Sequence, residues 1–147
     1  MNRRLWGVPL RPDYEWTKDV SIGAPSDWSA EEWLRASWEG ARRPLRIVLA
    51  FAWKYGLGLR LGPSTDKTRV LGWHIAETQA NCVTVEAASR ILSAENTIKV
   101  DGDTIKWRTN VRYSNAGGRL IWSLARVAHQ FLVPMLVRRA IRGRDNR

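Results

Sequence analysis

Residues 103–114 read DTIKWRTNVRYS, and this stretch decides the fold. One row of its alternating side chains is Ile105, Trp107, Thr109, Val111 and Tyr113, and the other row is charged or polar. A period of two is typical of a β-strand that buries one face and exposes the other to water. Residues 90–100 predict a preceding strand. The dipeptide Asp101-Gly102 between them predicts a two-residue hairpin turn whose central residues need positive φ.

The same alternation extends toward the N-terminus. Residues 70–78 and 82–88 each predict a strand, so several antiparallel strands follow one another as a meander. Residues 13–22 predict a further half-buried strand near the start of the chain. Residues 23–69 therefore separate the first predicted strand from the rest of the sheet in sequence.

Two helices are predicted in that interval. Ser29 and Glu32 have the spacing of a capping box, and Trp28 and Trp33 occupy the two positions of a hydrophobic staple. The first helix should therefore begin at Ser29 and end near Ala41. Pro44 suits the first turn of a second helix over residues 45–55.

The longest predicted helix spans residues 119–141, after a Gly117-Gly118 break. Its apolar side chains recur at intervals of three and four, which indicates a face that should be buried. That stripe is Leu120, Leu124, Val127, Phe131 and Met135.

The order of strand, two helices, antiparallel strands and long C-terminal helix resembles the helix-grip fold of the SRPBCC superfamily, an α+β class. This superfamily contains START lipid-transfer domains, pollen-allergen-like proteins and polyketide cyclases, and the chain looks most like its small bacterial members. The stretches that carry the resemblance are residues 29–33, 100–103, 109–113 and 118–122, with His129 two turns later. It covers nearly the whole chain, but it concerns architecture, because none of these stretches is a catalytic signature.

The resemblance implies a curved sheet that grips the last helix and leaves an apolar cavity between them. The expected lining is Trp73, Trp107, Tyr113, Trp122 and Phe131. For any one of these residues, filling the core is the simpler interpretation. Cavities lined by aromatic groups with a few polar atoms are where small ligands bind.

Length and charge set further bounds. The length of 147 residues predicts one domain, over residues 13–141. The net charge is +10, and residues 1–12 and 142–147 have an excess of basic side chains, so we interpret these two segments as solvated tails. The single Cys82 and the absence of a signal-like apolar run favour the cytoplasm. No metal-ligand or cofactor motif is present, so we expect neither a metal nor a cofactor.

Two side chains are candidates for proton transfer. Glu77 continues the apolar parity of its strand, so it either points inward with a raised pKa or, as the simpler interpretation, is solvated at the strand end. His129 either reaches the cavity or, as we expect, bonds a carbonyl that Pro134 frees.

Three functions remain open. The favoured one is binding or carrying an apolar small molecule, a lipid or aromatic metabolite. A polyketide cyclase- or dehydratase-like enzyme using Glu77 or His129 is the second, although catalysis is the less favoured class. The third is a basic surface that binds nucleic acid or an anionic membrane, and only weakly because the middle of the chain is nearly balanced in charge. Exposed tryptophan faces could also support a homodimer.

Overall fold

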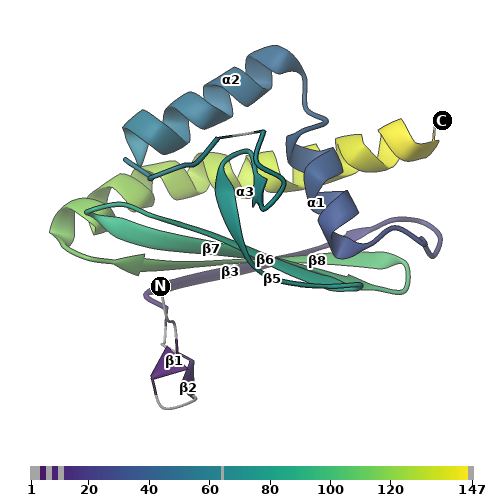
Figure 1. Ribbon diagram of the computed structural model, residues 1–147, viewed down its shortest axis with the longest axis horizontal. Helices are drawn as coiled ribbons and strands as arrows, with labels where there is room; N and C mark the ends of the chain where they lie inside the picture. The colour runs from purple at the N-terminus through teal and green to yellow at the C-terminus, as the bar shows by residue number, and fades with distance from the viewer. Residues whose placement is uncertain (1–3, 6–7, 10–11, 64, 146–147) are drawn as a thin grey trace.

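The computed structural model describes residues 4–5, 8–9, 12–63 and 65–145. A curved six-stranded antiparallel sheet carries the helices on one face (Figure 1), which confirms the predicted α+β helix-grip layout. The strands, in spatial order, are β3 (Tyr14–Ser21), β8 (Thr104–Tyr113), β7 (Leu92–Asp101), β6 (Cys82–Ala88), β5 (Trp73–Gln79) and β4 (Arg69–Val70). The helical elements are α1 (Ala30–Trp38), α2 (Arg43–Phe51), the π-helical turn η1 (Ala52–Gly56) and α3 (Ala116–Asp145).

Outside this sheet, β1 (Arg4–Leu5) and β2 (Val8–Pro9) form a separate two-stranded sheet. At the other end, residues 142–145 of the expected basic tail belong to α3. The rest of the two expected tails, residues 1–3, 6–7, 10–11 and 146–147, lies outside the described residues.

The inward row of β8 is buried as its alternation predicts. Ile105, Trp107, Thr109 and Val111 are all buried, whereas Tyr113 is half-buried. β8 is flanked by β3 on one side and by β7 on the other, so its whole length is hydrogen-bonded. The predicted β7–β8 hairpin is confirmed, but its turn lies one residue later than expected, at Gly102-Asp103, and only Gly102 has a positive φ.

The expectation of one strand over residues 70–78 is wrong. Leu71 has a φ of 47° and Gly72 a φ of 89°, and these two residues form a tight turn between β4 and β5. Leucine rarely adopts this left-handed conformation, so a leucine does not indicate a turn. Leu71 also continues the alternation of apolar residues, which is why the sequence predicted an unbroken strand. Val70 and Trp73, on either side of the turn, are paired and buried.

The first helix begins as predicted. The Ser29 side chain accepts a hydrogen bond from the Glu32 amide, the reciprocal half of the capping box is also present, and the Trp28 and Trp33 rings lie 4.7 Å apart. Pro44 occupies the first turn of α2, and Trp33, Leu34 and Trp38 of α1 form the centre of the core.

α3 extends beyond the predicted residues 119–141, and the apolar stripe that was expected to be buried is exposed. The exposed fractions of Leu124 and Phe131 are 71% and 77%, and Leu120, Val127 and Met135 are exposed as well. The face that packs inward is a different one: Gly118, Trp122, Val133, Leu136, Val137 and Ala140. Because α3 is apolar on more than one face, periodicity alone could not select the buried one.

By length and composition alone, α3 could also cross a membrane. Its residues 116–144 contain a window of mean hydropathy 1.4, of which 28% is buried inside the structure. This is weak evidence, since a core helix of a soluble protein satisfies the same criterion.

Candidate functional site

A cavity of about 440 Å³ lies between α3, the α2–η1 segment and the sheet. From α1, α2, η1 and the following residue it is lined by Trp38, Leu49, Ala52, Trp53, Gly56 and Leu57; from the sheet by Trp73, Ala94, Asn96 and Thr109; and from α3 by Ile121, Trp122, Leu124, Ala125, Ala128, His129, Leu132, Val133 and Leu136. All but three of these residues present carbon or indole surface.

The cavity opens between two helical segments. Four lining residues are themselves exposed: Ala52 and Gly56 of η1, and Leu124 and Ala128 of α3. The remaining lining residues are buried or half-buried. The mouth is therefore framed by η1 on one side and by α3 on the other.

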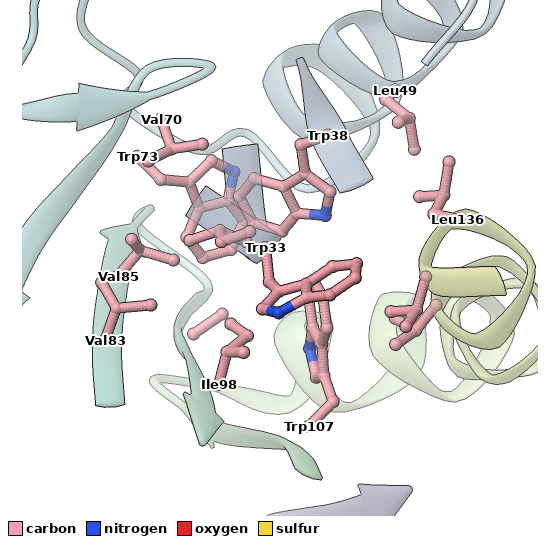
Figure 2. Packing of buried hydrophobic residues seen from close by; sticks show 14 of the residues in the cluster. Trp33, Trp38, Leu49, Val70, Trp73, Val83, Val85, Ile98, Trp107 and Leu136 are labelled. Atoms are coloured by element: carbon pink, nitrogen blue, oxygen red, sulfur yellow. The ribbon is translucent and has the colours of Figure 1, made fainter. Parts of the chain in front are cut away.

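A tryptophan cluster forms part of the cavity wall. The Trp38 ring lies 4.9 Å from that of Trp53, 5.4 Å from Trp73 and 5.8 Å from Trp107, centroid to centroid. Figure 2 shows Trp33, Trp38 and Trp107 gathered between the strands and Leu136 of α3. Tilted rings at these separations add to the stability of the apolar contact, so this wall is well held.

The polar groups of the lining form one chain of hydrogen bonds on the sheet side. Asn96 Oδ1 accepts from Trp107 Nε1 at 3.0 Å and from Thr109 Oγ1 at 2.6 Å, and Thr109 Oγ1 lies 3.1 Å from His129 Nε2. An indole N–H only donates, so the Asn96 oxygen must face it. The Thr109 proton is then used toward Asn96, which leaves His129 Nε2–H as the donor to Thr109.

His129 is held as a neutral imidazole. Its ring lies 5.1 Å from that of Trp16 and 5.3 Å from that of Trp122. Burial lowers the pKa of His129 from its ordinary 6.5 to about 4. At neutral pH the cavity therefore carries no imidazolium charge. His129 Nδ1 is buried, and among the residues that the structure describes it has no hydrogen-bond partner.

The structure brings together three of the residues singled out from the sequence. Trp73, Trp122 and His129 line the cavity. Trp107 is buried outside the lining and donates a hydrogen bond to Asn96.

Tyr113 and Phe131 fall outside the cavity lining. Tyr113 is half-buried beneath the Arg119 guanidinium, 5.6 Å from the ring centroid, and burial raises the pKa of its hydroxyl. Phe131 projects from the outer face of α3, with 77% of it exposed.

Glu77 is not brought to the cavity. It is exposed near the end of β5, where its carboxylate accepts a hydrogen bond from Gln79 Nε2 at 3.2 Å. The β5–β6 register shifts between Ile75 and Glu77, so the apolar parity does not continue to Glu77. For His129 the outcome is the opposite of the one expected, because it reaches the cavity and bonds Thr109 rather than a carbonyl near Pro134.

Sequence reasoning missed the contributions of α1, α2 and β7. Trp38, Leu49 and Trp53 line the cavity from helices whose apolar faces indicate only that they pack somewhere. Asn96 offered a signal, because it shares the inward parity of Ala94 and Ile98 and interrupts an apolar row with an amide. A polar residue at such a position must find a partner, and here it finds Trp107 and Thr109.

Among the described residues, no three His, Cys, Asp or Glu side chains gather as metal ligands would. No protein-family model matches the chain, and no curated protein matches it at a significant level. The cavity is therefore interpreted from its own chemistry.

Proposed function

We propose that this protein binds an uncharged apolar small molecule, of lipid or aromatic type, in the cavity beneath α3. The observation that carries the proposal is the cavity itself, about 440 Å³ with an almost wholly apolar lining. Small-ligand sites typically measure roughly 300–1,000 Å³ and combine apolar walls with a few placed polar groups. The chain fits a cytoplasmic carrier of the SRPBCC type, which its sequence resembles.

The polar chain on the sheet side supports an uncharged ligand. Asn96, Thr109 and His129 largely satisfy one another, and the low pKa of His129 keeps the site neutral. A charged ligand would lose its hydration, and the described lining residues hold no opposite charge to replace it. Affinity would come mainly from apolar area, at roughly 25 cal/mol per Å² before the costs of binding.

The alternative, a cyclase- or dehydratase-like enzyme, has less support. With a pKa of about 4, His129 is a poor general base at neutral pH. Glu77 is exposed outside the lining, so of the two acid/base candidates considered from the sequence only His129 lies at this cavity.

The test uses N-phenyl-1-naphthylamine, an uncharged apolar fluorophore that accepts energy from tryptophan. We expect saturable binding of the fluorophore with energy transfer from Trp53, Trp73 and Trp122. Native mass spectrometry of the purified protein should also show a bound apolar molecule, and extraction with organic solvent should remove it. Ala125 lies half-buried in the lining, so Ala125→Phe should fill the space and weaken probe binding at least about tenfold.

The matched control is Ala50→Phe, an exposed position of α2 outside the lining, which should leave probe binding unchanged. If Ala125→Phe does not fold, Ala128→Phe at the mouth serves the same purpose. Equal probe affinity in the cavity and control variants would overturn the proposal.

A further inference from the structure

The described residues leave nine large apolar side chains exposed, and all nine lie on α2, η1 and α3. We call them the apolar rim: Ile47, Val48, Phe51 and Tyr55 on the α2–η1 segment, and Leu120, Leu124, Val127, Phe131 and Met135 on α3. Single exposed apolar residues are ordinary, but a concentration of this kind marks an interaction surface.

The apolar rim borders the cavity mouth on both sides. Leu124 belongs to the rim and to the cavity lining at once. On the other side, the Phe51 and Tyr55 rings lie 4.8 Å apart and flank Ala52, which also lines the cavity. Figure 1 shows α2 and α3 on the same face of the sheet. Whatever covers the rim would therefore lie at the entrance.

The charge of the molecule is concentrated in the same two segments. Residues 40–65 and 115–145 together hold 11 of the 24 basic residues and one of the 14 acidic residues, so they carry the whole net charge of +10. The remaining residues hold 13 basic and 13 acidic side chains and are neutral. The exposed basic side chains of these segments include Arg42, Arg43, Lys54, Arg138 and Arg142.

This charge distribution discriminates between possible partners. A second copy of the chain would place two basic surfaces against each other, which is repulsive at a symmetric interface. A nucleic acid would meet the arginines but would leave the six non-aromatic side chains of the apolar rim in water. An anionic lipid bilayer accepts both parts, because its acyl region takes apolar side chains and its headgroups attract Lys and Arg.

We propose that the apolar rim docks peripherally on an anionic lipid bilayer, with the cavity mouth against the membrane. α3 stays packed on the sheet, because spanning the bilayer would remove Trp122, Val133 and Leu136 from the core. The docking does not depend on what the cavity binds. Its consequence, that a ligand passes between bilayer and cavity without crossing water, rests on the proposed function.

The test is co-sedimentation with vesicles of phosphatidylcholine mixed with phosphatidylserine, compared with vesicles of pure phosphatidylcholine. We expect binding to the mixed vesicles that falls as salt is raised and is much weaker on the pure ones. The pair Phe51→Ser and Phe131→Ser should weaken it at least about tenfold, since each ring loses its burial in the bilayer. Both rings are exposed, so folding should be unaffected.

The basic part is tested by the pair Arg138→Gln and Arg142→Gln, which should also weaken binding by about tenfold or more. Its matched control removes the same charge from the opposite face of the sheet, with Lys99→Gln and Arg108→Gln, both at exposed positions. The control should bind within about twofold of the wild type, since those charges lie away from the bilayer.

Four outcomes would overturn the docking proposal. In the first, the two serine substitutions leave vesicle binding unchanged; in the second, the protein forms a stable dimer and does not bind the vesicles. In the third, binding resists high-salt washing, as an inserted helix would. In the fourth, DNA displaces the vesicles completely and the serine substitutions have no effect. The variant Ala125→Phe separates the two proposals, because it should lose the fluorophore and still bind vesicles.

Discussion

The neutral His129 makes stability depend on pH. Its folded pKa of about 4 lies below its ordinary 6.5, so between these values the unfolded chain binds the proton and the folded chain does not. The stabilising contribution is complete above about pH 6.5 and is lost as the pH falls toward 4. A shift of this size corresponds to about 3 kcal/mol of unfolding free energy. Urea unfolding at several pH values measures it.

The variants isolate this effect from carboxylate titration, which all share. His129→Phe should reduce the pH dependence of the unfolding free energy between pH 4 and 6.5, because the buried imidazole is gone. Thr109 keeps its hydrogen bond to Asn96 in this variant. His74→Gln, at the exposed histidine, should keep the wild-type slope. If His129→Phe has that slope too, the account of His129 is wrong.

For single residues, the sequence predicted which side chains are buried or cap a helix better than it predicted backbone conformations. The inward row of β8 and the capping pair Ser29 and Glu32 were predicted, because each depends on local spacing alone. Leu71 could not be predicted, since nothing in a leucine signals a φ of 47°. The link from His129 to Thr109 joins residues 20 positions apart, which only the packed fold brings together.

Among the elements, α3 shows where periodicity reaches its limit. Its position was predicted, but the helix is longer than predicted and the stripe expected to be buried is exposed, because apolar residues occupy both the inner face and the rim. Near the start of α3, Gly118 lies so close to the β6–β7 connection that an added Cβ would clash with the Ile91 carbonyl oxygen. A glycine that permits such a close contact is a weaker sequence signal than a row of leucines.

This contact gives a prediction for α3. Gly118→Ala should destabilise the protein by roughly 1–3 kcal/mol, because the helix must move away from Ile91. At Gly143 in the same helix, no atom of the described residues lies within 4 Å of an added Cβ, so Gly143→Ala should stabilise by up to about 1 kcal/mol through helix propensity. Urea unfolding of the two variants measures both changes. A stabilising Gly118→Ala would contradict this packing of α3.

For the molecule as a whole, the order of elements was enough to predict a sheet covered by a long helix. The cavity itself was a consequence of the resemblance, and its lining from α1 and α2 depends on how three helices share one face of the sheet. Pattern reasoning assigns each helix an apolar side but does not measure the space left between them. The cavity exists only in the folded state, so a ligand that binds there binds the folded protein and not the unfolded chain.

A ligand that fills this space must therefore stabilise the whole fold. At a hundred times its dissociation constant, N-phenyl-1-naphthylamine should add about 2.7 kcal/mol to the unfolding free energy, a rise in Tm of about 5–10 °C. Ala125→Phe, which occupies part of the cavity with its own ring, should show a smaller rise, whereas Ala50→Phe should match the wild type. Thermal unfolding followed by circular dichroism measures all three. An equal rise in Ala125→Phe would mean that the fluorophore binds elsewhere, with the exposed rim on α2 and α3 as the first place to look.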